Sequence, residues 1–337
     1  MSTIVAAYLC LSVLLYFLLG GADFGAGIIE MFTSKKNVTR TRQTLYQAIG
    51  PIWEANHMWL IIAIVILFVG YPSIYSLLSI HLHIPLLLLL MGIIARGTAF
   101  VFRHYDAIQD GMQQVYNRIF VISSVVTPLF LGILAGSTLS GRIDPNADNF
   151  ADAYIYPWFN LFSISIGLFT VALCGFLAAV YLIGEADNEH DRRRFVTKAK
   201  ISNLLAVGFG LLVFASAKME SVPLTDWLFQ NPVGLVAVMT ASASLVLLWQ
   251  WINKKRSAVL RVLVAFQVTM ILLAITYAHF PNVILLTDGE SLSLKEAQAP
   301  EKTIQSLGWA LVIGSLFILP ALYYLFYSFQ KSEDYAH

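Results

Sequence analysis

Long apolar runs, separated by short polar segments, make up most of the chain. Nine such runs can be drawn, and each is long enough to cross about 30 Å of hydrocarbon as a helix that rises about 1.5 Å per residue. Their approximate spans are 3–32, 45–70, 74–103, 117–138, 155–184, 201–217, 228–252, 260–280 and 305–330. This pattern predicts an all-α integral membrane protein with about nine transmembrane helices.

The polar connections between these runs are too short to fold with cores of their own. The longest are 139–154, 185–200 and 281–304. We therefore predict a single polytopic membrane domain over residues 1–337. Because short connections place successive helices antiparallel, the first four helices (about 3–138) and the next four (about 155–280) are expected to form two bundles. The ninth helix, at about 305–330, is then added to them.

Composition agrees with this pattern and narrows the chemistry. Hydrophobic residues make up 58% of the 337 residues, charged residues 12%, and the mean hydropathy is +0.72, which is too apolar for a soluble protein of this size. A formal net charge of +1 gives no indication of a nucleic-acid partner. Cys10 and Cys174 fall within apolar runs without metal-ligand spacing. We expect two buried, unreactive thiols and no metal site.

The positions of lysine and arginine predict the orientation, because cytoplasmic loops are enriched in these residues. Of the 21 basic residues, 16 fall at one set of alternate connections: Lys35, Lys36, Arg40, Arg42, Arg103, Arg118, Arg192, Arg193, Arg194, Lys198, Lys200, Lys254, Lys255, Arg256, Arg261 and Lys331. The other connections hold 4, namely Arg142, Lys218, Lys295 and Lys302. We predict an outside N-terminus and a cytoplasmic C-terminus.

Three charged residues, Asp23, Glu54 and Arg96, lie inside the apolar runs of the first three helices. A charged side chain at the centre of a bilayer costs about 2.5–3.5 kcal/mol, so these residues need partners. All three fall in the predicted cytoplasmic half of the membrane. His57 shares a helix face with Glu54, since the two are three residues apart, and Asn56 adds a polar group at the same level. We expect one acid–base cluster.

Two interpretations of this cluster remain open. In the first, Arg96 neutralises one acid, and the ion pair only holds helices together. In the second, the acid that Arg96 leaves unpaired takes up and releases protons as a member of a proton relay. His57 is a candidate for the same proton path or for a hydrogen-bonding role. Ligation of a haem by this one intramembrane histidine is the less favoured interpretation.

The segments that hold these charges have a distinctive sequence. Asp23 lies in GADFGAG, whose glycines allow helix backbones to approach closely. Helix 2 opens with GPIWEANHMWL, residues 50–60, and helix 3 ends with ARGTAFVFRH, residues 95–104. Trp53, in the helix 2 segment, is suited to packing on a cofactor or, by default, on neighbouring helices.

These three segments resemble motifs of subunit II of cytochrome bd-type quinol oxidases: a glycine–acid motif in helix 1, GP-W-acid-x-N-x-x-W in helix 2, and RG-x-A-x-x-FR in helix 3. They cover about the first third of the chain, and the remainder matches in hydropathy and topology. The resemblance matches Asp23 and Glu54 to the motif acids, Arg96 and Arg103 to the two arginines, and Trp53 to the tryptophan.

The sequence departs from the family pattern at three positions. Glu54 stands where many members have Asp, which keeps the proton chemistry on a longer side chain. His57 stands where many carry an acid, and Ala22 replaces a bulkier residue. These differences concern the branch of the family rather than membership in it.

The resemblance implies a complex in a bacterial or archaeal cell membrane that oxidises ubiquinol or menaquinol and reduces O2 to water. The expected partner is a larger subunit I, which carries b-type haems and a haem d, or a further haem b in its place. A small single-helix subunit is a further candidate partner. This chain is then expected to bind no cofactor and to have no catalytic centre of its own.

Within such a complex, this subunit would stabilise the haem assembly of subunit I and bring protons from the cytoplasm. The resemblance assigns the proton path to Glu54 and Asp23. The residues expected to support assembly are Arg96, Trp53, Arg103 and Asn56.

A proton-coupled secondary transporter is the alternative, because it would also bury acids and an arginine. A transporter with inverted repeats predicts matched interruptions in both halves of the chain. Here the polar motifs crowd into helices 1–3, and we expect no comparable buried charge in helices 5–9. The oxidase interpretation is therefore preferred.

Overall fold

The computed structural model describes residues 1–50, 52–105, 111–254 and 256–334, so that Pro51 of the helix 2 motif and Lys255 of the basic set lie outside the described residues. Its elements are α1 (Ser2–Leu15), a π-helical turn (Tyr16–Gly20), α2 (Gly21–Met31), α3 (Val38–Ile49), α4 (Trp53–Gly70), α5 (Pro72–His81), α6 (His83–Tyr105), α7 (Met112–Leu139), α8 (Phe150–Tyr154), α9 (Leu161–Gly184), α10 (Glu189–Met219), α11 (Leu224–Phe229), α12 (Pro232–Trp251), α13 (Ser257–His279), β1 (Asn282–Leu285), β2 (Ser291–Ser293) and α14 (Glu301–Asp334).

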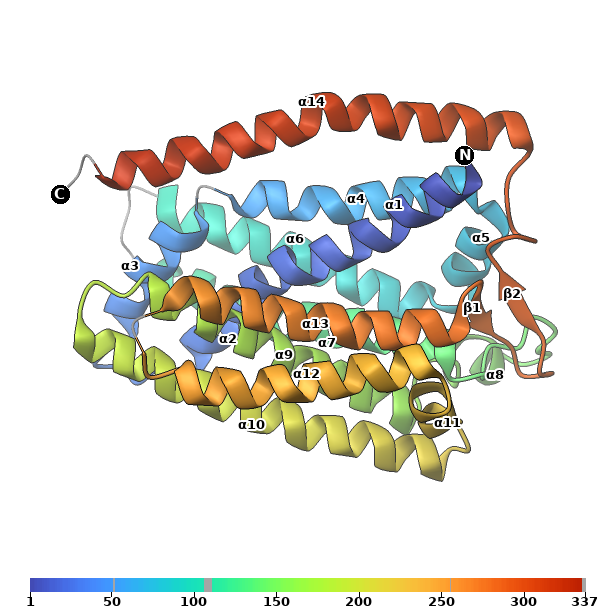
Figure 1. Cartoon of the computed structure of the whole chain (residues 1–337), viewed down its shortest axis with the longest axis horizontal. Coiled ribbons are helices and arrows are strands. Elements are labelled where there is room, and N and C mark those ends of the chain that lie inside the picture. Colours follow the sequence, from blue (N-terminus) through green and yellow to red (C-terminus); the bar gives the residue numbers. More distant parts are fainter. Residues whose placement is uncertain (51, 106–110, 255, 335–337) are drawn as a thin grey trace.

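The predicted all-α membrane fold is confirmed for the described residues. Nine helices there are long and apolar enough to cross a membrane; α1, the π-helical turn and α2 together form the first of them. Figure 1 shows the long helices running back and forth along one axis, with the short β1–β2 hairpin at one end. The fold thus follows from the need to satisfy every backbone polar group inside the bilayer by intrahelical hydrogen bonds.

Several predicted spans have different limits: the run predicted at 201–217 belongs to the longer helix α10, the run predicted at 155–184 begins at Leu161, and two further runs are divided differently. The run predicted at 45–70 becomes a membrane-spanning helix only from Trp53, because residues 38–49 form the separate, polar helix α3. The run predicted at 74–103 is divided into α5 and α6 near Leu82. Pro85 explains this division, since a proline ring inside a continuing helix clashes with the carbonyl four residues earlier, whereas it is tolerated in a first turn.

One hydrophobic core joins the two predicted sets of helices. The largest cluster of buried side chains includes Ala26 of α2, Phe176 of α9, Phe195 of α10, Leu248 of α12 and Val264 of α13. The helix α14 packs against α1 and α4 (Figure 1), and many of its apolar side chains are exposed. The first membrane-spanning helix is therefore in contact with the later helices through α2 and with α14 through α1.

The connections at 32–37, 185–188 and 252–254 lie at the same end of the molecule as the last turns of α14 (Figure 1), and we call this end the basic end. The prediction that both cysteines are buried is half wrong. Cys174 is buried in α9, but Cys10 is exposed on α1, because it lies on the face of that helix that no other described helix covers.

Candidate functional site

The buried charges of the N-terminal helices are organised around α2. This helix follows directly on the π-helical turn Tyr16–Gly20, a widened turn of a kind that is frequent at functional sites. Asp23 lies in the first turn of α2, and its side chain is fully buried. A carboxylate that is buried within a membrane-spanning segment requires a partner of opposite charge and a full set of hydrogen bonds.

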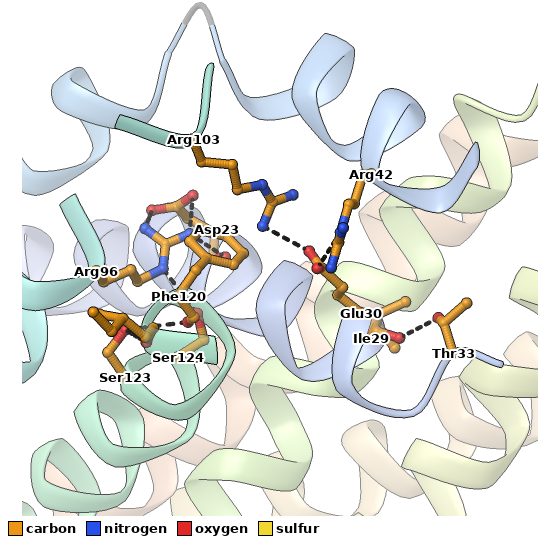
Figure 2. A network of polar contacts seen from close by, with 11 residues as sticks. Asp23, Ile29, Glu30, Thr33, Arg42, Arg96, Arg103, Phe120, Ser123 and Ser124 are labelled. Carbon is orange, nitrogen blue, oxygen red and sulfur yellow. Dashed lines mark hydrogen bonds and ion pairs between the residues drawn. The ribbon is translucent and has the colours of Figure 1, made fainter. Parts of the chain in front are cut away.

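Arg96 of α6 supplies both the opposite charge and the hydrogen bonds for Asp23 (Figure 2). Its Nη1 donates to Asp23 Oδ2 at 2.6 Å and its Nη2 to Asp23 Oδ1 at 2.7 Å, which is a bidentate pair. The same Nη2 also donates to the Asp23 carbonyl oxygen at 2.8 Å. Arg96 is only 1% exposed. We predicted that Arg96 neutralises one acid, and the structure identifies that acid as Asp23.

The helix α7 completes the environment of this guanidinium. Arg96 Nε donates to Ser124 Oγ at 3.1 Å, and that hydroxyl donates to the Phe120 carbonyl oxygen at 2.6 Å. The Phe120 ring lies 4.9 Å and the Phe24 ring 5.4 Å from Arg96 Cζ, within the range of cation–π attraction. Three helices therefore converge on one ion pair, which makes it a link between them.

His57 of α4 also reaches Asp23. Its Nε2 lies 3.6 Å from Asp23 Oδ2, and its ring is surrounded by the rings of Tyr16, Phe24 and Trp53 at 5.7–6.3 Å between centroids. The other ring nitrogen, Nδ1, is buried and has no hydrogen-bond partner among the described residues. The His57 imidazole thus has one nitrogen near the Asp23 carboxylate and one buried nitrogen that no described residue engages.

A second buried acid, Glu30, was missed from the sequence. Its Oε1 accepts a hydrogen bond from Arg42 Nε of α3 at 2.6 Å, and its Oε2 lies 2.9 Å from Arg103 Nη1 of α6 (Figure 2). A repeated spacing could have revealed it. Asp23 and Glu30 are seven residues apart, as are Arg96 and Arg103, and the two helices run in the same direction. The same spacing on both helices therefore forms a second acid–arginine pair, Glu30 with Arg103, about 10 Å along the helices from the pair of Asp23 with Arg96.

Glu54 does not join this cluster, which corrects the prediction that the three N-terminal charges gather together. Its side chain is exposed in the first turn of α4, and it forms no ion pair with another described residue. The reason is rotational: His57 follows three residues later, about 60° around the helix, and faces Asp23, whereas Glu54 faces outward. Arg96 therefore has one carboxylate to neutralise instead of two.

The remaining predicted residues surround this site. Trp53 packs at its edge, with its ring 5.4 Å from that of Phe100, and a Cβ atom at Gly97 would lie 3.3 Å from the Trp53 ring. Asn56 is buried, and its Oδ1 has no hydrogen-bond partner among the described residues. Within the part of the chain that the structure describes, no group of three metal-ligating side chains occurs.

The later part of the chain contains a buried acid as well, in the connection predicted at 185–200 and therefore outside the predicted spans of helices 5–9. Asp191, in the first turn of α10, is 2% exposed and pairs with Arg40 Nε at 2.6 Å and Arg194 Nη1 at 2.7 Å. It lies at the basic end rather than at the middle of a span. Its pair with Arg40 connects α3 to α10, so it has an evident structural role.

The glycines around Asp23 allow two close helix contacts, as the GADFGAG pattern predicts. A Cβ atom at Gly25 would lie 1.9 Å from the Cys174 carbonyl oxygen of α9, and one at Gly27 would lie 2.1 Å from Ser124 Oγ of α7. Neither distance is compatible with a side chain. The absence of side chains at these positions lets α2 pack between α7 and α9, and so determines where Asp23 lies.

We expect Gly25→Ala to destabilise the protein, although alanine normally favours a helix over glycine by about 0.5–1 kcal/mol. The added methyl group would force α2 away from α9, at a cost typical of overpacking, about 1–3 kcal/mol. Thermal unfolding of the purified protein would measure the effect. Gly208→Ala in α10 is the matched control, because nothing lies within 4 Å of its Cβ position. Equal stability of the two variants would contradict this account.

Comparison with known proteins agrees with this arrangement. The family model for cytochrome bd terminal oxidase subunit II matches residues 1–329. Subunit 2 of the cytochrome bd ubiquinol oxidase of Bacillus subtilis is 30% identical over 160 residues, 47% of this chain and 46% of that protein. Subunit 2 of the Escherichia coli K12 cytochrome bd-I ubiquinol oxidase is 25% identical over 166 residues, 48% and 43% of the two chains.

These two matches span somewhat less than half the length of each relative. A putative cytochrome bd menaquinol oxidase subunit II of Bacillus subtilis matches over 96% of this chain and 94% of its own length, at 21% identity. A chain of the bd oxidase structure from Geobacillus thermodenitrificans has the same fold, with a TM-score of 0.70 at 20% identity over 96% of this chain and 98% of that one. With the family model matching nearly its whole length, this chain belongs to the cytochrome bd terminal oxidase subunit II family.

Proposed function

We propose that this chain is the subunit II of a quinol:O2 oxidoreductase and pairs with a haem-bearing subunit I in a cell membrane. Family membership supports this proposal, as do relatives whose names include both ubiquinol and menaquinol oxidases. In this role the chain holds subunit I in its assembled form and supplies it with protons for the reduction of O2 to water.

The observation that carries the proposal is the position of Glu54. It lies on a face of α4 whose other members, Ile61, Val65 and Phe68, are apolar and exposed. These residues follow Glu54 by 7, 11 and 14 positions, which places them within about 40° of it around the helix. Glu54 lies in the first turn of a membrane-spanning helix, and a carboxylate there carries a cost if its otherwise apolar face meets lipid. A partner subunit that covers this face and uses the carboxylate removes that cost.

His57 connects Glu54 to the buried pair. A proton passed from Glu54, directly or through water, binds the open Nδ1 of His57 and gives an imidazolium. Asp23 Oδ2, 3.6 Å from Nε2, lies on the other side of the ring. Arg96 occupies both oxygens of Asp23, so in this proposal Asp23 contributes a fixed negative charge while Glu54 and His57 carry the proton.

The predicted orientation places the entrance of this path at the basic end. If that end faces the cytoplasm, protons reach Glu54 and His57 from the cytoplasm and continue to a haem in subunit I. Arg96, Arg103, Trp53 and Asn56 keep α2, α4 and α6 in register beside that route. The haems themselves would be held by subunit I and would supply the oxygen and electron chemistry.

The proton-coupled transporter is not favoured. The buried charges of the described residues gather between α2, α6 and the basic end, and Asp191, the acid of a later helix, is paired at that same end. A transporter with inverted repeats would place interrupted helices and binding groups at the middle of both halves.

Co-purification tests the proposed function. An affinity-tagged form of this chain, extracted in mild detergent from its native membrane, should carry a larger polytopic protein and the absorbance of b- and d-type haems, or of b-type haems alone. Quinol-dependent O2 consumption should follow the same fractions. A chain that purifies without a pigmented companion and moves a solute unaided in vesicles would contradict the proposal.

A further inference from the structure

A polar cavity lies beside Glu30, between α3, the last turn of α6 and the start of α7. Its volume is about 260 Å³, and its described lining consists of Arg42, Gln43, Tyr46, Arg103, Gln113 and Asn117. Each of these side chains has an N–H or O–H group that can donate a hydrogen bond. No carboxylate lies among the described lining residues. The cavity therefore presents positive charge and hydrogen-bond donors to a ligand.

The charges around this cavity do not cancel among the described residues. Figure 2 shows Arg42 of α3 and Arg103 of α6 approaching the single carboxylate of Glu30. That carboxylate balances one arginine, and no other described carboxylate lies within ion-pair distance of either guanidinium. Because charges withdrawn from water are costly unless they are paired, the remaining positive charge favours an anion in the cavity.

The two guanidinium groups also have donors that the described residues do not use. The Arg103 side chain is only 5% exposed. Its Nη1 lies 2.9 Å from Glu30 Oε2 but is not aligned for a hydrogen bond, and it has no hydrogen-bond partner in the described part of the chain. Arg42 donates to Glu30 through Nε, which leaves both of its Nη atoms without a partner there. Buried donors without acceptors are rare in folded proteins, so a ligand with several acceptor atoms is expected.

A phosphate group matches this set of donors. Its oxygens accept several hydrogen bonds at once, its charge balances the remaining arginine, and the planar guanidinium group binds phosphate through two parallel hydrogen bonds. The amides of Gln43, Gln113 and Asn117 add neutral donors around the two cations. These three side chains form no hydrogen bond with another described residue. The lining is thus suited to an oxyanion rather than to a cation or an apolar molecule.

The cavity lies at the level of the lipid head groups. Arg103 is the twenty-first of the 23 residues of α6, and α3 is a polar helix outside the membrane spans. Basic pockets between membrane-spanning helices at the cytoplasmic side bind anionic head groups. Exposed apolar side chains lie at the same level, Val101 and Phe102 on α6 and Val115 and Ile119 on α7. The acyl chains of a lipid whose phosphate enters the cavity can cover them.

We propose that this cavity binds one phosphate group, held by the two arginines Arg42 and Arg103 and by the amides that line it. The phosphate neutralises the excess charge beside Glu30 and joins α3 to α6 and α7. A membrane phospholipid and inorganic phosphate both supply this group, and the exposed apolar side chains nearby favour the phospholipid. The site is separate from the proposed proton path, because neither Glu54 nor His57 lines the cavity.

Binding measurements on the protein purified from its native membrane, with the subunits that accompany it, test the proposal without requiring turnover. Native mass spectrometry counts bound phosphatidylglycerol in detergent that contains this lipid, and equilibrium dialysis measures bound radiolabelled inorganic phosphate. Gln113→Glu places a carboxylate in the cavity, and like charges brought together repel, so we expect the loss of one bound phosphate group per complex. Arg42→Gln should cause the same loss, because it removes one cation and leaves Glu30 paired with Arg103.

Gln114→Glu is the matched control, because it makes the same substitution at the next residue of α7, which is exposed and does not line the cavity. It should keep the wild-type count, and lipid bound elsewhere is common to all samples. Asn117→Asp introduces the same charge with almost no change in size and replaces Gln113→Glu if that variant does not assemble. Loss of phosphatidylglycerol identifies a lipid as the source, and loss of inorganic phosphate identifies the free anion. An unchanged count of both probes in either cavity variant, or an equal loss in Gln114→Glu, would overturn the proposal.

Discussion

Replacing Arg96 with methionine is expected to prevent assembly of the complex or to strip it of haem. The substitution leaves Asp23 ionised and buried without the guanidinium that occupies both of its oxygens. Removal of one partner from a buried ion pair costs about 3–5 kcal/mol, a large part of the stability of a typical folded domain. It would also release the contact from α6 to Ser124 of α7. Haem absorbance per mole of purified protein measures the outcome.

Two further variants make this prediction specific. Arg193→Met removes an arginine whose side chain is 80% exposed and should leave haem content unchanged. Combining Asp23→Asn with Arg96→Met removes both charges and should recover part of the assembly that Arg96→Met loses, because no unpaired charge remains buried. Normal haem content in Arg96→Met alone would show that the pair does not hold the helices together.

Replacing Glu54 with glutamine should slow O2 reduction at least about tenfold while leaving the haem spectrum and the subunit composition normal. Glutamine has nearly the same size but cannot bind or release a proton, and proton transfer by a positioned side chain commonly contributes 10²–10⁴-fold to a rate. The exposed position of Glu54 on this chain predicts that folding is unaffected. Quinol-dependent O2 uptake by the purified complex measures the effect.

Glu189→Gln, at an exposed carboxylate of α10, is the control for the loss of one negative charge. Glu54→Asp should retain most of the activity, because it keeps a titratable group on the same face. Unchanged turnover in Glu54→Gln, with a normal spectrum, would exclude a proton-carrying role for this residue. Such a result would leave the family assignment intact, since that assignment rests on the match over residues 1–329.

Arg96→Met and Glu54→Gln together separate the two interpretations of the charged cluster that the sequence left open. If the charged residues serve only to hold helices together, Arg96→Met is severe and Glu54→Gln has no effect. If they also carry protons, both variants are defective, but in different measurements. The structure supports a division of this kind, because Asp23 is fully engaged by Arg96, whereas His57 Nδ1 and Glu54 are open to further partners.

The sequence by itself determined the membrane fold, the approximate helices and the presence of an ion pair between Arg96 and one of the buried acids, but not which acid. Helix number follows from hydropathy because the thickness of the hydrocarbon imposes a minimum length on each apolar run. The ion pair could be predicted because a charge inside lipid is rare and requires a partner. The role of the motif glycines in close helix packing could also be predicted. Gly25 and Gly27 occupy places where the structure leaves no room for a side chain.

Only the tertiary structure decided which way each side chain faces. Hydropathy gives the depth of Glu54 and Glu30 along their helices but not the rotation of those helices or the identity of their neighbours. The rotation of α4 turns Glu54 outward and His57 toward Asp23, and the parallel course of α2 and α6 brings Glu30 to Arg103. The exposure of Cys10 and the polar cavity beside Glu30 likewise depend on which helices pack together. Contacts between helices distant in sequence leave little trace in the pattern of any one of them.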